Sequence, residues 1–188
     1  MVLYLERNTH ALRRLIRSLM STKGGPPTPY RWTLVDTTVG PALVVVTEAG
    51  VRAIRFRVSP DEAHLDPSRR DDAGLREIAD AVRGLVDGSR RDFPFPLDLD
   101  QGTPFERRVW AELRTIPQGQ TLTYGELARR LGLPAGASRA VGRAAGANPL
   151  PVVVPCHRVV AADGKLGGYA GGIDIKAHLL RVEGAILT

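Results

Sequence analysis

Cysteine is almost absent from this chain of 188 residues, since Cys156 is the only one. A single cysteine excludes an internal disulfide. It also argues against a closed zinc site, because the histidines are scattered without the spacing of metal ligands. These histidines are His10, His64, His157 and His178. The sequence therefore predicts neither a cross-link nor a bound metal.

Long apolar runs are missing as well. No stretch approaches the ~20 residues that are needed to span a bilayer. The amino-terminal segment also has no apolar core followed by the small-residue cleavage site of a signal peptide. We therefore expect a soluble, cytoplasmic protein with no membrane partner.

Charge of one sign prevails only in parts of the chain. The formal net charge is +6, with basic residues in excess over residues 1–29 and 101–188 and acidic residues in excess over residues 30–100. A basic carboxy-terminal half suits a surface that contacts phosphates, but such a balance is also common on solvated surfaces. Charge alone therefore leaves binding to nucleic acid open.

The chain divides into three segments, and its length allows one domain or two small lobes. Residues 1–28 contain apolar residues and arginines at the spacing of an amphipathic basic helix, followed by a Gly/Pro break. We expect this extension to be either such a helix or poorly ordered, with Met20 as an alternative start. Residues 29–100 predict an α/β lobe, and residues 101–188 predict a mostly helical lobe.

The middle segment predicts a small sheet with one helix. Three β-rich pieces separated by Gly/Pro turns are typical of a meander, and they cover residues 32–35, 43–47 and 51–58. Apolar residues at helical spacing predict a helix over residues 75–86, which Gly88 closes. Residues 93–97 are typical of an edge strand or an extended linker. The acidic residues of this segment predict a solvated face, and no catalytic set is evident in it.

The carboxy-terminal segment opens with strong helix signals. Thr103 can act as an N-cap, Pro104 suits the first helical position and Glu106 completes a capping box. Together they predict a helix over residues 103–115. Thr123 is placed to cap the next helix.

Two short helices follow, joined by a Gly/Pro turn as in a helix-turn-helix. The first is expected over residues 124–131 and the second from about Ser138 to Ala147. The second is built almost entirely of small residues besides Arg139 and Arg143, so it can approach another surface closely. Two explanations stay open, namely tight packing against a helix and insertion into a narrow DNA groove.

The segment around the cysteine carries the main chemical signal. Pro151 and Pro155 fix the backbone, so the apolar run between them is expected to arrive extended and to stop at the thiol. His157 and Arg158 follow Cys156 directly and provide a proton acceptor and a positive charge, which favour a thiolate nucleophile. The alternative is a cysteine that serves as a small buried hydrophobe.

Several motifs around this cysteine agree in order with those of a known family. They are Asn148-Pro149-Leu150-Pro151, Pro155-Cys156-His157-Arg158-Val159, Gly167-Gly168-Tyr169-Ala170-Gly171-Gly172, Lys176, Leu179-Leu180 and Glu183-Gly184. From about Gly102 to Gly184 the chain resembles the active-site domain of the O6-alkylguanine-DNA alkyltransferases, with weaker likeness back to about Tyr30. Relatives of this family without enzymatic activity carry Trp where this chain has Cys156.

The resemblance implies an α+β fold in which a small sheet-plus-helix lobe precedes a mostly helical lobe with the helix-turn-helix and the cysteine. It implies DNA repair by irreversible, stoichiometric transfer of an alkyl group from O6-alkylguanine to Cys156. The partner is double-stranded DNA with the damaged nucleotide flipped out, and no cofactor is implied. We expect a monomer. Activity on O4-alkylthymine and cooperative binding to DNA stay open.

The resemblance also assigns catalytic roles. His157 takes the thiol proton through a water and Glu183 orients His157; neighbouring residues on an extended chain point to opposite sides, which leaves room for that water. Tyr124 maps to a phenol that donates to the guanine ring. Asn148 maps to a residue that ties the turn before Cys156 to the sulfur. The alternatives are an exposed charge for Glu183, a half-buried aromatic for Tyr124 and an ordinary turn former for Asn148.

Contacts with DNA are implied for the third helix, which enters the minor groove in this family. Arg139 maps to the residue that fills the gap left by the flipped nucleotide, and a phosphate contact is its alternative role. Ser138 and Arg143 lie on the same helix and are further candidates.

The base pocket is implied to lie against the glycine-rich loop. Tyr169 should form its wall, and the backbone of Cys156 and Val159 should read the base edge. Ala170 stands where many relatives have Ser, which weakens the contact to O6 only if that contact requires a hydroxyl.

Two other functions are considered. A non-catalytic module that binds alkylated DNA and recruits repair factors would flip the same base, but Cys156 argues against it. A cysteine hydrolase requires a second histidine near the thiol, and the remaining histidines lie in no recognisable motif.

Overall fold

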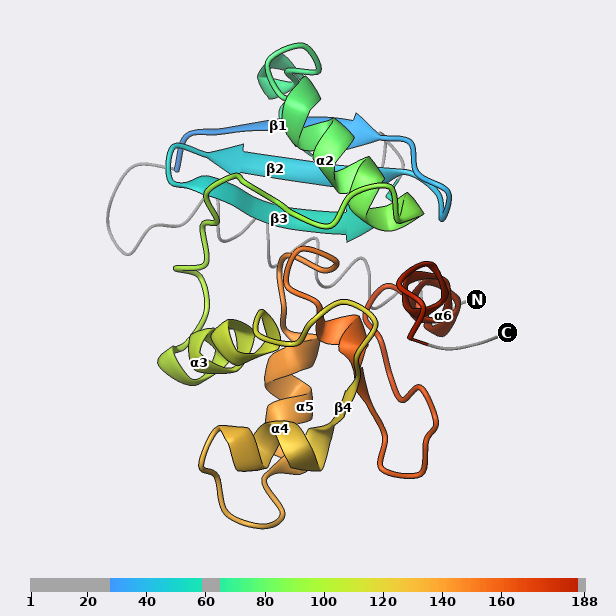
Figure 1. The fold of residues 1–188 in the computed structure, drawn as a ribbon. Coiled ribbons are helices and arrows are strands. Elements are labelled where there is room, and N and C mark those ends of the chain that lie inside the picture. Colours follow the sequence, from blue (N-terminus) through green and yellow to red (C-terminus); the bar gives the residue numbers. More distant parts are fainter. Residues whose placement is uncertain (1–27, 59–64, 186–188) are drawn as a thin grey trace.

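The computed structural model describes residues 28–58 and 65–185. The amphipathic helix expected before Met20 lies outside the described residues. The described chain forms two stacked lobes, with a sheet and one helix in the upper lobe and a group of helices in the lower one (Figure 1). This arrangement confirms the predicted α+β fold class. Within this part of the chain, no helix is long and apolar enough to cross a membrane.

The upper lobe is a three-stranded antiparallel sheet in the order β1-β2-β3, which confirms the predicted meander. The strands are β1 (Tyr30–Val35), β2 (Ala42–Thr47) and β3 (Gly50–Phe56). All residues of β2 are buried, and helix α2 (Arg76–Asp87) lies over one face of the sheet. On the other face, Leu43 and Val45 of β2 form a second apolar cluster with Trp32 and Leu65. α2 ends at Gly88 with φ 81°, as the sequence predicted.

β3 ends two residues before the predicted limit. Arg57 adopts a φ of 59°, and this left-handed conformation turns the chain out of the sheet. A short 3-10 turn, η1 (Pro67–Arg69), then lies between the sheet and α2.

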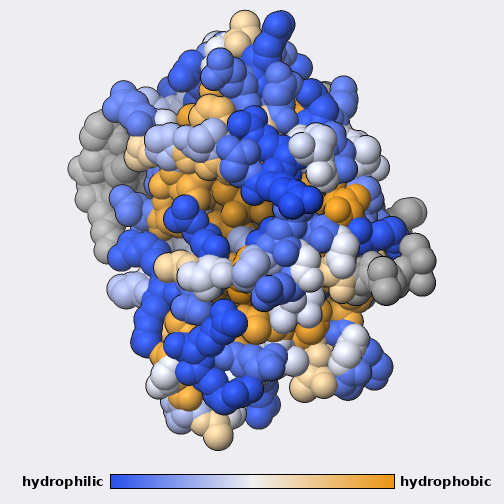
Figure 2. All heavy atoms as spheres, in the orientation of Figure 1, coloured by the Kyte–Doolittle hydropathy of each residue, from blue (hydrophilic) through white to orange (hydrophobic). Residues whose placement is uncertain are grey.

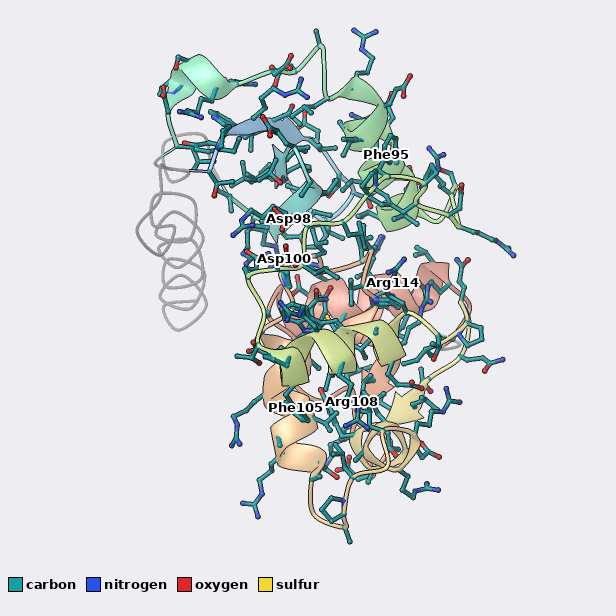
Figure 3. The ribbon with its side chains drawn as sticks, turned by 90° about the vertical axis from the view of Figure 1, so that its left-hand side faces the viewer. Phe95, Asp98, Asp100, Phe105, Arg108 and Arg114 are labelled. Carbon is teal, nitrogen blue, oxygen red and sulfur yellow. The ribbon has the colours of Figure 1, made fainter. Side chains whose placement is uncertain are left out.

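The segment that leads to the lower lobe runs beside β3. The N–H of Val51 donates to the Pro96 carbonyl at 2.8 Å, and the N–H of Asp98 donates to the Val51 carbonyl at 2.9 Å. Residues 93–97 are therefore an extended linker with one bridge to the sheet, Val51 to Leu97. Figure 3 shows Asp98 on this segment, above the helix that follows it.

The prediction that the acidic residues of the middle segment are solvated is wrong for Asp98. Its carboxylate is buried and accepts hydrogen bonds from Thr47 Oγ1 and Arg52 Nη1, both at 2.7 Å. Arg52 is buried as well, because the linker folds back beside the strand that carries it. A buried carboxylate is stable only with such partners.

The lower lobe contains four helices and a short two-stranded ladder. The helices are α3 (Pro104–Leu113), α4 (Tyr124–Arg130), α5 (Ser138–Gly146) and α6 (Ile173–Val182). The predicted capping box between Thr103 and Glu106 is present, and Thr123 forms a second one with Glu126. These local signals place the starts of α3 and α4.

The small residues of α5 serve tight packing on one of its faces. Ala144 and Ala145 are buried, and Trp110 of α3 donates its indole N–H to the Ala144 carbonyl at 2.8 Å. Arg139 and Arg143 lie on the other side of the helix and are exposed. Helix packing therefore explains one face of α5, and the second face is open to solvent.

The segment before the cysteine is a tight turn, so the prediction of an extended run is wrong. The N–H of Val154 donates to the Leu150 carbonyl at 2.8 Å, and Val152 adopts a φ of 70°. The two prolines that flank this turn fix their own φ, but the left-handed residue between them reverses the chain. A 3-10 turn, η2 (Cys156–Arg158), follows. Strand β5 (Val159–Val160) then pairs in parallel with β4 (Leu122–Thr123).

Candidate active site

The thiol of Cys156 lies in the core between the two lobes. The residue is buried and belongs to the main hydrophobic cluster. Asn148 Nδ2 donates to Cys156 Sγ at 3.1 Å and to the Val154 carbonyl at 2.8 Å, while Asn148 Oδ1 accepts the N–H of Leu150 at 2.9 Å. One amide side chain therefore hydrogen-bonds to two backbone groups of the turn before Cys156 and also donates to the sulfur, as the resemblance implied.

Two positive charges act on this sulfur. Burial raises the pKa of the Cys156 thiol, while the Asn148 hydrogen bond and the charges of Lys176 and Arg55 oppose that rise. Lys176 is fully buried on α6, and its Nζ donates to the Val159 carbonyl at 2.5 Å. Burial lowers the pKa of Lys176 to about 8, against the opposing effect of Cys156.

Lys176 is a functional candidate to which the sequence assigned no role. It appeared only as part of a motif. The signal that identifies it is its position on α6 among the buried residues Ile175, Leu179 and Leu180, because a lysine is rarely buried without a partner.

His157 and Glu183 form a buried pair, so Glu183 is not an exposed charge. His157 Nε2 lies 2.9 Å from Glu183 Oε1, and the exposed fractions of the two side chains are 0% and 5%. Arg158 donates Nε to Glu183 Oε2 and Nη2 to Glu183 Oε1, both at 2.8 Å. Burial alone would raise the pKa of Glu183, but the hydrogen bonds from His157 and Arg158 lower it to about 2.

This pair fixes the tautomer of the imidazole. Burial lowers the pKa of His157 more than Glu183 raises it, so the ring is neutral near pH 7. An ionised carboxylate only accepts hydrogen bonds, so the ring proton lies on Nε2. His157 Nδ1 is buried and has no hydrogen-bond partner among the described residues, which leaves it as the basic atom.

The expected geometry of Cys156 and His157 needs a correction. The two residues share the η2 turn, so the extended chain on which that geometry was argued is not present. Their side chains have different partners, because Asn148 donates to the sulfur and Glu183 binds the imidazole. The ring of His157 faces that of Tyr169 edge-on, with centroids 6.5 Å apart.

Tyr124 lies beside the glycine-rich loop and α5. A Cβ on Gly142 or Gly167 would lie 3.6 Å from its ring, at ordinary van der Waals distance, so the ring lies against both positions. Burial raises the pKa of the Tyr124 phenol, and the nearby charge of Cys156 acts in the same direction. The phenol is therefore neutral near pH 7 and can donate a hydrogen bond.

The remaining predicted pocket residues surround this centre at different depths. Val159 is buried beside Cys156, Tyr169 is half-buried and Ala170 is exposed. Gly171 packs against the Tyr169 ring, where a Cβ would lie 2.9 Å from Cε1.

The predicted DNA-contacting residues lie apart from the thiol, on α5. Ser138 is half-buried at the start of the helix, and the side chains of Arg139 and Arg143 are exposed. The end of the molecule that carries α4 and α5 is largely hydrophilic, with smaller apolar areas between the polar residues (Figure 2).

Comparisons with known proteins agree on one group of relatives. The family model described as 6-O-methylguanine DNA methyltransferase, DNA binding domain, matches residues 104–185. A methylated-DNA–protein-cysteine methyltransferase of Methanosarcina acetivorans is 38% identical over 155 residues, which cover 82% of this chain and 98% of the relative. One of Salmonella typhimurium is 60% identical over 163 residues, covering 81% and 95%.

Solved structures give the same result. The structure of Mycobacterium tuberculosis OGT in complex with DNA has a TM-score of 0.70 and 38% identity, and the alignment covers 82% of this chain and 92% of that one. The methyltransferase of Pyrococcus kodakaraensis has a TM-score of 0.61 and 29% identity, with 81% and 99% covered.

Proposed function

Because the chain belongs to the methylated-DNA–protein-cysteine methyltransferase family, we propose that it repairs O6-alkylguanine in double-stranded DNA by moving the alkyl group to Cys156. The observation that carries this proposal is the hydrogen bond from Asn148 to the sulfur of the only cysteine, beside a buried histidine–glutamate pair. A thioether is not readily cleaved by water, so each molecule acts once. The protein works in the cytoplasm, with the DNA.

The thiol proton leaves first, in this proposal. His157 Nδ1 accepts it through a water, and Glu183 stabilises the imidazolium that forms, because its carboxylate is ionised above about pH 2. The buried charge of Lys176 stabilises the thiolate, because charges interact more strongly where water is excluded.

The transfer is a displacement at the alkyl carbon. The bond from Cys156 Sγ to this carbon forms while the bond from the carbon to guanine O6 breaks, and the electron pair of the broken bond stays on the base. The Tyr124 hydroxyl donates a hydrogen bond to the base as that charge develops. The base then regains one proton, so the reaction has no net change in protons. No step requires a cofactor.

The damaged nucleotide must leave the stack to reach the buried sulfur, at a cost of a few kcal/mol. Arg139 on the exposed face of α5 fills the gap and hydrogen-bonds to the orphaned base, while Ser138 and Arg143 contact the backbone. Tyr169 and Ala170 of the glycine-rich loop border the base with the backbone of Val159. The exposure of both arginines on α5 supports this assignment.

Intact-mass measurement after mixing with a methylguanine-containing duplex tests the proposal. We expect a gain of one methyl group per chain, complete at one equivalent of lesion. Cys156→Ala should abolish the gain but retain DNA binding. Binding without any gain in the unchanged protein would support the alternative of a non-catalytic module, and more than one group per chain would exclude a single acceptor.

A further inference from the structure

Strand β3 of the upper lobe forms hydrogen bonds to the active-site segment at the Pro149 carbonyl. The Pro149 carbonyl accepts the backbone N–H of Ile54 at 2.9 Å and Nη1 of Arg55 at 2.8 Å, and both donors belong to β3. The same Nη1 also donates to the Ile54 carbonyl at 2.8 Å. Arg55 therefore bridges the edge of the sheet and the turn that precedes the cysteine.

This carbonyl is directly linked to the residue that contacts the sulfur. Pro149 follows Asn148 in the chain, and Asn148 Nδ2 lies 3.1 Å from Cys156 Sγ. The Pro149 carbonyl and the Leu150 N–H belong to one planar peptide group, and this N–H donates to Asn148 Oδ1 at 2.9 Å. The contact from β3 thus constrains the direction in which the Asn148 amide points.

Arg55 also carries a permanent positive charge that acts on the thiol. Its neighbours Ile54 and Phe56 are buried, and Arg55 itself is half-buried between the lobes. A guanidinium in such surroundings loses hydration and interacts more strongly with other charges than it would at the surface. Its charge is one of those that lower the pKa of Cys156.

We propose that Arg55 is a positioning residue for alkyl transfer, which sets the Asn148 amide on the sulfur of Cys156 and stabilises the thiolate from the opposite lobe. The upper lobe is then part of the reaction machinery. This inference rests on the proposed role of Cys156 as the nucleophile.

The test compares Arg55→Met, Arg55→Lys and Arg31→Met. Methionine retains length but removes the donors and the charge, and lysine retains the charge. Arg31 lies on β1 of the same sheet and pairs with Asp71 at 2.6 Å within the upper lobe, so it serves as the matched control. For each variant, the rate at which Cys156 is alkylated is measured as a function of pH, once with iodoacetamide and once with free benzylguanine.

Arg55→Met should raise the pH midpoint of both profiles and slow the benzylguanine reaction at pH 7 by about two- to fivefold, less than the loss of Lys176, because the charge of Arg55 acts more weakly on the thiol. Arg55→Lys should restore the midpoint, and Arg31→Met should change neither quantity. A lower melting temperature for Arg55→Met with an unchanged midpoint would show a merely structural role and overturn the proposal. Reaction with iodoacetamide but not benzylguanine in the unchanged protein would count against the proposed function alone.

Discussion

Replacing Glu183 by glutamine provides a sharp test of the buried ion network. Its carboxylate accepts hydrogen bonds from His157 Nε2 and from two nitrogens of Arg158, and its side chain is only 5% exposed. The pKa falls from 4.5 to about 2, which corresponds to about 3 kcal/mol of stabilisation. Removing one partner of a buried pair costs ~3–5 kcal/mol, in agreement with that figure.

The loss of stability caused by Glu183→Gln should depend on pH. A carboxyl whose pKa is lower in the folded state stabilises the fold fully above its unfolded pKa, and this contribution disappears as the pH falls through the folded pKa. The difference between Glu183→Gln and the unchanged protein should therefore be complete above about pH 4.5, about half near pH 3 and lost below about pH 2.

Urea unfolding followed by circular dichroism measures this difference at each pH. At pH 7 the melting temperature should fall by roughly 6–12 °C. Glu112→Gln is the control, because Glu112 lies 3.9 Å from Arg130 in a partly exposed pair that contributes at most ~0.5 kcal/mol. A loss that is equal at pH 7 and pH 3, or smaller than that of the control, would refute the reasoning.

Three other changes test the proposed site. Lys176→Met should slow alkylation of Cys156 at pH 7 about tenfold and shift the pH profile of thiol reactivity to higher pH, because a buried cation that stabilises the thiolate is lost. An unchanged pH profile would contradict the role of Lys176. Arg139→Ala should slow repair in duplex DNA much more than reaction with free benzylguanine, and the salt dependence of DNA binding should change by less than about one phosphate contact. Equal losses of rate on both substrates would count against a contact between Arg139 and the orphaned base. Alkylation of Cys156 should lower the free energy of unfolding by ~1–3 kcal/mol, more for benzyl than for methyl, because the buried pocket is overfilled; a melting temperature that is unchanged or raised for both adducts would show that the pocket accommodates the product.

Local signals in the sequence predicted the elements that depend on a few neighbouring residues. The capping box of Thr103 and Glu106 and the glycine at position 88 act within one helical turn, so the limits of α3 and α2 follow from them. The meander followed from the alternation of β-rich pieces and turns.

Features that depend on distant partners could not be predicted in this way. Asp98 is buried because Arg52, 46 positions away, provides its counter-charge. The turn before the cysteine is stabilised by the side chain of Asn148, which replaces the extended course that the prolines suggest.

The candidate site was predicted mainly from the family resemblance and only partly from the chemistry of the residues around Cys156. The residues following Cys156 indicated a base and a charge near the thiol, but the buried cations come from elsewhere. Lys176 reaches the site from α6, and Arg55 reaches it from a strand 94 positions before Pro149. No spacing in the sequence reports such contacts.

Val152, with its φ of 70°, limits how this protein can be made more stable by directed evolution. The left-handed region costs ~1–2 kcal/mol for most residues and is a real outlier for a β-branched one. Glycine would relieve that strain, but Val152 is 5% exposed and belongs to the apolar cluster that contains Cys156, so glycine would also open a cavity. Selection at this position therefore faces two opposed demands, and stabilising substitutions should accumulate at sites remote from the turn.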